Sequence, residues 1–382
     1  MARLNAKALA RLRAVMQAHI DNARLPGAIV AVALGGHVEM FEAMGQRDAA
    51  SGAAMPADAI FRIYSMTKPL VSLAALMLVE EGRLQLFDPI AKYLPEFAEL
   101  QVGVEEGGGI RLEPARRQAT VHDLLRHTAG FTYGFLGNSA VQRQYQAADL
   151  ADRSRSNAQF CQALAKLPLA QHPGSGWQYS HATDVLGSLL EVVTGQSLGT
   201  LLAERIFAPL GMKDTAFSVP REHWDRIAEP FAKDPDSGEP VFMMKAREVP
   251  ALESGGGGLV STADDYIRFL QLMRNRGSLA GTRLVSRKTV EWMTSDHLGG
   301  IPAHGDLLMP GYGFGLGFSV RMQAGLAPLP GSVGQYFWSG IGGTLFFIDP
   351  AEDLFALLLT QAPNQRIFFR HLFRHLVYAA ID

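Results

Sequence analysis

Residues 61–82 read FRIYSMTKPLVSLAALMLVEEG, and this stretch decides how the fold is interpreted. Ser65 and Lys68 lie three residues apart, immediately before a long apolar run. Because proline is tolerated in a helix only in the first turn, Pro69 places the start of a helix close to Ser65. Residues at i and i+3 share a helix face, so Lys68 leans toward Ser65. We therefore predict a buried helix over residues 65–81 with a lysine at its entrance.

This pair of residues has an ordinary explanation and a catalytic one. Serine often caps a helix and lysine is common in first turns, so an isolated S-x-x-K pattern is weak. Here the apolar run that follows must be buried, and burial disfavours the charged form of a lysine. Such a lysine can act as a base or tune a neighbouring base. Ser65 would also lie beside the unpaired N–H groups at the positive end of the helix. The stretch thus predicts an activated serine nucleophile, which requires a proton shuttle and an oxyanion hole.

The composition narrows the class of protein. The chain has 382 residues, of which 48% are apolar and 19% charged, with a formal net charge of -2. These values are typical of a globular protein with a large core and give no reason to expect a nucleic-acid or membrane partner. The single cysteine, Cys161, excludes an internal disulfide. The first 25 residues form an amphipathic pattern without the apolar core of a signal peptide. We therefore expect a soluble cytoplasmic protein.

The order of the secondary-structure signals predicts the architecture. Strand patterns flank Gly35-Gly36 near the N-terminus and return after Pro250, whereas helical patterns dominate between them. We predict an α+β fold, an α/β sandwich in which N- and C-terminal segments build one antiparallel sheet flanked by helices. The predicted α/β domain comprises residues 1–83 and 235–382. An inserted all-helical domain spans residues 84–234.

Three short elements together resemble a known superfamily. Ser65-Met66-Thr67-Lys68 is similar to the S-x-x-K element of serine β-lactamases and penicillin-binding proteins. Tyr179-Ser180-His181 stands where that superfamily has Tyr-x-Asn, and Trp338-Ser339-Gly340 stands where it has Lys-Thr-Gly. The resemblance covers nearly the whole chain and is greatest to the family VIII carboxylesterases, which share the class C β-lactamase fold.

The resemblance implies a role for each catalytic group. Ser65 would attack an ester carbonyl and form an acyl-enzyme. Tyr179 would take the serine proton and return it to the leaving alcohol, with Lys68 favouring the tyrosinate. Water would then release the acyl group through Tyr179. The oxyanion hole would consist of the backbone N–H groups of Ser65 and Ile341. Whether Lys68 or Tyr179 rests without its proton stays open at this point.

Two departures from the β-lactamase pattern bear on the substrate. Trp338 replaces the lysine that holds a carboxylate and offers apolar surface instead, while His181 replaces the asparagine. A Trp-x-Gly third element is the form seen in the esterases, which predicts a neutral small-molecule ester as substrate. The expected substrate-binding residues are Trp338, Ser339, Gly340, His181, Tyr133 and Phe135. No metal or cofactor is expected, and the sequence does not indicate an oligomeric state.

Other functions fit the same residues. A β-lactamase or D-amino-peptidase would use the same nucleophile, although Trp338 and His181 count against it. An acyltransferase would replace water by an alcohol or amine. A non-catalytic binding protein on a retained scaffold is the remaining alternative, and the presence of all three of Ser65, Lys68 and Tyr179 counts against it.

Several motifs have structural explanations. Residues 195–199 match G-x-S-x-G, but they lie between two helical patterns, so Gly195 is expected to end one helix and Ser197 to cap the next. His371 and His375 have a zinc-like spacing but stand among arginines. Gly255 to Gly258 are expected to let the backbone pass close to the site, before a helix capped by Ser261. His127 is expected to be a buried, hydrogen-bonded histidine.

Overall fold

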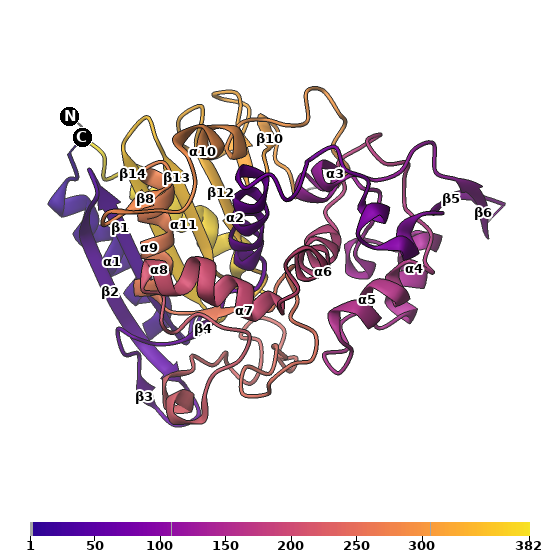
Figure 1. Cartoon of the computed structure of the whole chain (residues 1–382). Coiled ribbons are helices and arrows are strands. Elements are labelled where there is room, and N and C mark those ends of the chain that lie inside the picture. The colour runs from indigo at the N-terminus through magenta and orange to yellow at the C-terminus, as the bar shows by residue number, and fades with distance from the viewer. Residues whose placement is uncertain (1–2, 108, 306) are drawn as a thin grey trace.

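The computed structural model describes residues 3–107, 109–305 and 307–382, and in these ranges one antiparallel sheet of eight strands joins the two ends of the chain (Figure 1). Strand β1 pairs with its hairpin partner β2 on one side and with β14 on the other, which confirms the predicted sheet. The strands follow one another in space as β10 (Tyr312–Phe314), β11 (Ser319–Arg321), β12 (Tyr336–Ser339), β13 (Leu345–Asp349), β14 (Leu354–Thr360), β1 (Gly27–Leu34), β2 (His37–Asp48) and β3 (Ala53–Ala54).

Helices cover both faces of this sheet, as successive residues of β13 show. Phe346 packs against Tyr266 of α9 (Ala263–Arg274), whereas Phe347 packs against Phe373 of α11 (Arg366–Tyr378). Successive side chains of a strand point to opposite faces, so α9 and α11 lie on opposite sides. The N-terminal helix α1 (Ala6–Asp21) packs beside α11 (Figure 1).

The central helix α2 (Thr67–Glu80) is the predicted buried helix. A 3₁₀ turn, η1 (Tyr64–Met66), precedes it, so the helical stretch begins within a residue or two of the predicted start. Every residue from Thr67 to Leu78 is buried, because α2 lies between the sheet on one side and α6 (Ala182–Thr194) and α7 (Leu198–Leu202) on the other (Figure 1). The start of α2 therefore lies where the sheet meets the helical region.

The region between residues 84 and 194 carries most of the remaining helices, on the right of Figure 1. They are α3 (Val121–Leu125), α4 (Ala140–Ala147), α5 (Asn157–Leu164) and α6, with the 3₁₀ turns η2 (Ile90–Lys92), η3 (Pro95–Phe97) and η4 (Gly134–Leu136). The prediction that this region is all-helical is wrong at one point, because β5 (Gln101–Glu106) and β6 (Gly109–Pro114) form a hairpin. The proposed domain boundaries at residues 83/84 and 234/235 stay a prediction.

Shorter elements complete the chain. After α7 come a π-helical turn η5 (Ala203–Phe207), α8 (Ala208–Leu210), η6 (Arg221–Arg226) and, beyond α9, α10 (Arg287–Met293). The two-residue strand β4 (Phe61–Arg62), which precedes α2 in the chain, pairs with β7 (Val260–Ser261), and β8 (Ser278–Leu279) pairs with β9 (Thr282–Arg283). Helix α9 is capped by Thr262 and not by Ser261, which belongs to β7. Within the described residues no single helix is long and apolar enough to cross a membrane; α6 and residues Leu198–Leu210, bent by 82°, meet that criterion as a pair.

Candidate active site

Ser65 lies in the 3₁₀ turn η1, which leads directly into α2, and it follows a strained residue. Tyr64, the residue before it, has a φ of 45°, in the left-handed region that non-glycine residues rarely adopt. Strain of this kind is common where a fold must present a reactive group. The turn is held in place because the Tyr64 hydroxyl accepts a hydrogen bond from the N–H of Met244 at 2.8 Å. No side chain caps the helix here, so the Ser65 hydroxyl is not used as a cap.

Lys68 is almost fully buried, with 1% of its surface exposed, and its ammonium group reaches three oxygen atoms. The Nζ atom lies 2.6 Å from the carbonyl oxygen of Gly256, 3.1 Å from the hydroxyl of Tyr133 and 3.4 Å from the Oγ of Ser65. The predicted approach of Lys68 to Ser65 is thus present. A buried ammonium must be matched by acceptors, and each of its three N–H groups has one.

The hydroxyl of Tyr133 bonds to Lys68, and the predicted contact of Tyr133 with substrate stays a prediction. This tyrosine follows α3 in a loop, and burial raises the pKa of Tyr133 well above its usual range, so it stays a neutral phenol. Phe135 stacks on the Tyr133 ring and is 64% exposed, whereas Phe131 is buried against Phe97. Only Phe135 among these phenylalanines has a surface that a ligand could cover without a rearrangement.

Tyr179 lies next to Tyr133 against Lys68, with the two ring centres 5.4 Å apart. The Lys68 Nζ stands 4.6 Å from the centre of the Tyr179 ring, and the indole Nε1–H of Trp338 donates to the Tyr179 hydroxyl at 3.2 Å. The imidazole of His127 packs 4.9 Å from the same ring. Trp338 is 5% exposed and its polar atom is directed at Tyr179, and its predicted contact with the ester stays a prediction. Since an indole can only donate, it favours a Tyr179 oxygen that carries negative charge.

The chain turns sharply after Trp338, at the proposed oxyanion donor. Gly340 fits against the backbone of Ile63, where a Cβ atom would come within 2.2 Å of the Ile63 oxygen. Arg370 of α11 donates to the Gly340 carbonyl, and burial lowers the pKa of this guanidinium to about 9. Among the described residues, the N–H of Ile341 donates to no other protein group. The assignment of the N–H groups of Ser65 and Ile341 to an oxyanion hole stays a prediction.

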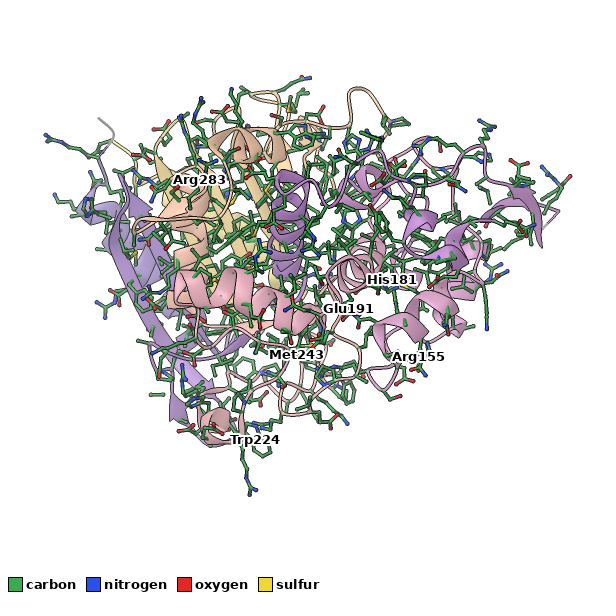
Figure 2. All side chains as sticks on the ribbon, viewed as in Figure 1. Arg155, His181, Glu191, Trp224, Met243 and Arg283 are labelled. Atoms are coloured by element: carbon green, nitrogen blue, oxygen red, sulfur yellow. The ribbon has the colours of Figure 1, made fainter. Side chains whose placement is uncertain are left out.

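One residue that the sequence did not single out connects several of these groups. Asp184 is buried in the first turn of α6, three residues after His181, which is labelled in Figure 2. One oxygen, Oδ2, lies 3.0 Å from His181 Nδ1; the other, Oδ1, accepts from the N–H of Gly256 at 2.9 Å and from Ser254 Oγ at 2.5 Å. Gly256 is also the residue whose carbonyl accepts from Lys68. In the sequence, Asp184 could have been noticed as a single acidic residue within the mainly apolar stretch ATDVLGSLL.

His181 packs among aromatic rings as well as on Asp184. Its ring centre lies 4.2 Å from that of Tyr133 and 5.4 Å from that of Phe160. Its contact with substrate, like that of Ser339 and Gly340, stays a prediction.

Two of the motifs given structural explanations, the G-x-S-x-G match and His127, have the expected structure. Gly195 ends α6 in a left-handed conformation, and Ser197 caps α7 by accepting from the N–H of Thr200. His371 and His375 both lie on α11, and no group of three or more potential metal ligands occurs among the described residues. His127 is buried with its Nδ1 at 3.3 Å from Ser180 Oγ, and burial holds its pKa well below the usual range.

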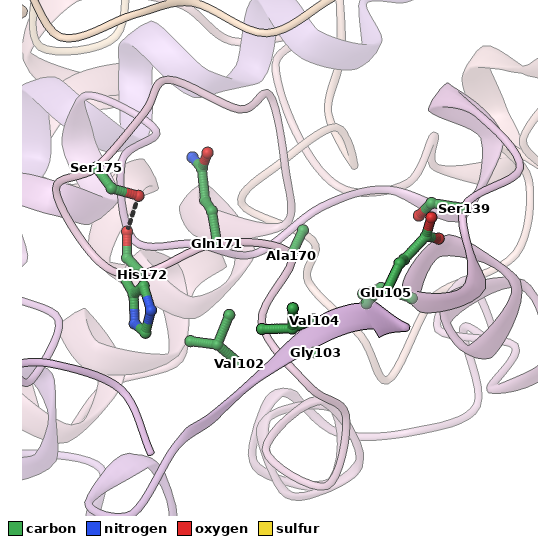
Figure 3. A pocket seen from close by; sticks show the side chains of 10 residues that line it. Val102, Gly103, Val104, Glu105, Ser139, Ala170, Gln171, His172 and Ser175 are labelled. Atoms are coloured by element: carbon green, nitrogen blue, oxygen red, sulfur yellow. Dashed lines mark hydrogen bonds between the residues drawn. The ribbon is translucent and has the colours of Figure 1, made fainter. Parts of the chain in front are cut away.

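A pocket of about 390 Å³ lies away from these residues, in the helical region (Figure 3). It is lined by residues of β5 and by a second segment that includes Gln171, His172 and Ser175. Figure 3 shows the Ser175 hydroxyl bonded to the carbonyl of His172 at 2.8 Å. None of the predicted site residues lines this pocket.

Comparisons with known proteins agree with the geometry. Residues 12–378 match the family described as Beta-lactamase. Esterase EstB of Burkholderia gladioli is 36% identical, over 92% of this chain and 90% of its own length. Lovastatin esterase of Penicillium rubens is 32% identical, over 74% of this chain and 72% of its own. Among solved structures, EstCE1, described as a hydrolase with promiscuous acyltransferase activity, superimposes with a TM-score of 0.82 at 28% identity, covering 97% of this chain and 98% of its own.

Proposed function

We propose a specific reaction for this chain, which belongs to the beta-lactamase family and is a serine hydrolase of its family VIII esterase branch. The proposed reaction is hydrolysis of short-acyl carboxylic esters through an acyl-enzyme on Ser65. Lys68 and Tyr179 form the pair that moves the proton. The esterases among its relatives support the reaction class.

The observation that carries this proposal is the contact between Trp338 and Tyr179. In place of a cation suited to a substrate carboxylate, the third element presents an indole whose only donor is already bonded to the Tyr179 hydroxyl at 3.2 Å. A neutral ester requires no cation there. The rings of Tyr133, His127 and Trp338 lie 5.4, 4.9 and 5.2 Å from that of Tyr179, and this crowding supports a small acyl group.

The proposed reaction begins with acylation of Ser65. The Ser65 oxygen attacks the ester carbonyl carbon while its proton moves to the Tyr179 oxygen, and the negative charge on the former carbonyl oxygen meets the N–H groups of Ser65 and Ile341. The carbon–oxygen bond to the alcohol then breaks, and the alcohol leaves with the proton from Tyr179. A water molecule repeats both steps on the acyl-enzyme, which releases the acid and restores Ser65.

Hydrolysis of p-nitrophenyl acetate and butyrate tests this function directly. The wild-type protein should hydrolyse both esters, Ser65→Ala should lose the activity, and mass spectrometry of a quenched reaction should find the acyl group on Ser65. Ser197→Ala, which alters the serine of the G-x-S-x-G match, is the control and should retain activity. Activity in Ser65→Ala would refute the assignment.

Acyl transfer is a second candidate, supported by the likeness to EstCE1. An acyl-enzyme on Ser65 reacts with an alcohol in the same way as with water when the alcohol occupies the water's position. Addition of a primary alcohol to a p-nitrophenyl butyrate reaction distinguishes the two. A transferase gives mainly the new ester at alcohol concentrations where a hydrolase still gives mainly butyric acid.

A further inference from the structure

The buried Lys68 lacks a direct ionic partner. Its three contacts are a carbonyl, a phenol and a serine hydroxyl, and within the described ranges no carboxylate lies within salt-bridge distance of its Nζ. A buried ammonium without a nearby negative charge is costly, even when its hydrogen bonds are satisfied. A carboxylate in the next layer of residues can supply such a charge.

Asp184 provides a negative charge in that layer. Burial alone would raise the pKa of Asp184, but the hydrogen bond from His181, the Lys68 charge and the hydrogen bond from Ser254 outweigh it and hold the pKa below the usual range. Asp184 is therefore a carboxylate at neutral pH. Its only ionic contact among the described residues is with His181, on the oxygen that does not bond Gly256.

Gly256 joins the carboxylate to the ammonium. Its N–H donates to Asp184 Oδ1 at 2.9 Å, and its carbonyl accepts from Lys68 at 2.6 Å. A Cβ on Gly256 would lie 2.5 Å from Asp184 Oδ2 and 2.8 Å from Oδ1, so only glycine allows the acid this close to the backbone. The acid thus fixes the backbone whose carbonyl holds the lysine.

We propose that Asp184 is a positioning residue whose negative charge keeps Lys68 an ammonium, so that Tyr179 alone acts as the base. The inference rests on the esterase function proposed above. It answers the question that the sequence left open, namely which of the two groups rests without its proton.

The hydrogen bonds around Lys68 agree with the ammonium form. An ammonium has three donors and no acceptor, and three oxygens stand in reach of Nζ. The shortest contact is to a carbonyl, which can only accept, and the carbonyl is oriented by the acid. A neutral amine would donate only two hydrogen bonds to these three oxygens. As an ammonium, Lys68 lies over the Tyr179 ring and stabilises the tyrosinate during proton transfer.

Other titratable groups also face this pair. Tyr133 and Tyr179 both contact Lys68. The charges of Lys68 and Asp184 both act on the imidazole of His127. Burial keeps Tyr133 and His127 neutral over the working range, since the pKa of Tyr133 is raised and that of His127 is lowered. His181 bonds Asp184 from its outer side. Asp184 is thus the group whose charge can be removed with least change of shape.

The pH profile of Asp184→Asn tests the proposal. Asparagine keeps an oxygen for Gly256 and Ser254 but removes the charge, so Lys68 should lose its proton at a lower pH. With ethyl butyrate in a pH-stat, the alkaline limb of kcat/KM should move about one pH unit toward acid. Asp265→Asn, at another buried acid that bonds Thr215 and the N–H of Asp214 outside the site, is the control and should leave the limb in place. Lower activity with an unmoved alkaline limb would overturn the proposal and leave a purely structural role.

Direct observation of Lys68 provides a second measurement if turnover becomes too slow. In protein carrying ¹³C at lysine Cε, the Lys68 signal, assigned by its loss in Lys68→Met, should change position at a lower pH in Asp184→Asn than in wild type. An identical titration in the two proteins would refute the inference. Failure of the proposed function has a different signature, since it would appear as ester hydrolysis retained by Ser65→Ala whatever Asp184 does.

Discussion

Asp123 and Asp184 are both buried acids in the helical region, and their surroundings differ. Asp123 bonds directly to Arg117 at 2.9 Å and Arg126 at 3.2 Å, and also caps the start of α3. Asp184 has no arginine, and the Lys68 cation lies beyond the backbone of Gly256. Burial opposes ionisation at both sites, but the hydrogen bond and charge of Arg117, with hydrogen bonds from the Thr128 hydroxyl and the Thr120 N–H, lower the pKa of Asp123 to about 2.

The two acids illustrate two roles of a buried charge. Asp123 contributes to stability, whereas Asp184 is proposed to affect catalysis. A directly paired acid contributes to folding and leaves its cation unavailable for chemistry. An acid that acts through a peptide group sets the charge state of a lysine while the ammonium stays free to approach Ser65 and Tyr179. Loss of Asp123 should therefore lower stability, and loss of Asp184 should alter catalysis.

Removal of the lysine should have the largest effect. Lys68→Met should lower kcat/KM for p-nitrophenyl butyrate about 1,000-fold or more, since it removes the group that favours the Tyr179 anion. It also removes the lysine charge that faces Asp184 across the Gly256 peptide group. Urea unfolding of Lys68→Met, Asp184→Asn and the double variant should show a coupling of about 1 kcal/mol. Strictly additive free energies of unfolding would mean that the two charges do not interact.

Removal of the directly paired acid should act on stability. Asp123→Asn should lower the free energy of unfolding at pH 7 by about 2 kcal/mol, as expected for a carboxyl whose pKa falls from 3.8 to about 2 on folding. A lowered pKa stabilises above the usual value, and that contribution is lost as the pH falls from about 4 toward 2. The difference between wild type and variant in urea melts should therefore shrink in acid. A difference that grows there would contradict the assignment, and kcat should change little at pH 7.

Loss of a neutral donor at Tyr179 should have an intermediate effect. Trp338→Phe removes the Nε1–H that donates to the Tyr179 hydroxyl but keeps an aromatic ring. We expect a roughly tenfold lower kcat, equivalent to about 1.4 kcal/mol for one hydrogen bond to a developing charge. The measurement is steady-state hydrolysis of p-nitrophenyl acetate, with Trp292→Phe on α10 as a matched control. Unchanged kcat with a raised KM would instead assign Trp338 to substrate binding.

The smallest effect is expected for one of the neutral acceptors of Lys68. Tyr133→Phe removes the hydroxyl at 3.1 Å from Nζ, and Ser65 and Gly256 remain as acceptors. Because two other oxygens remain for the ammonium, the net loss should be about 1 kcal/mol, so kcat/KM should fall about fivefold. Its pH profile should keep the wild-type alkaline limb, because no charge is removed. A shifted limb would mean that Tyr133 and Asp184 share the task of holding the lysine charged.

The sequence was sufficient to locate the start of the central helix and to give the order of the secondary-structure elements. Pro69 and the apolar run located the start of α2, and the strand patterns at both ends of the chain indicated one sheet. The β5–β6 hairpin was missed because a short strand pair in a helical context is defined by its partner, which a periodicity argument does not identify.

The missing parts of the site have a similar explanation. Asp184 and Gly256 are 72 residues apart in the chain, and nothing local marks them as partners. Their pairing follows from how α6 and the glycine-rich segment meet. The direction of the Trp338 indole also depends on tertiary packing, so its bond to Tyr179 could not be predicted from the residue type.

The hydrogen bonds of Lys68 also bear on the order in which parts of the protein unfold. Its acceptors at Tyr133 and Gly256 are 65 and 188 residues away in the chain, so its environment exists only when α2, the helical region and the glycine-rich segment are in contact. Any partial opening between them separates these atoms while the helices themselves persist. In mild denaturant, turnover should therefore disappear before the far-ultraviolet helical signal, and enzymatic activity becomes a sensitive gauge of tertiary cooperativity.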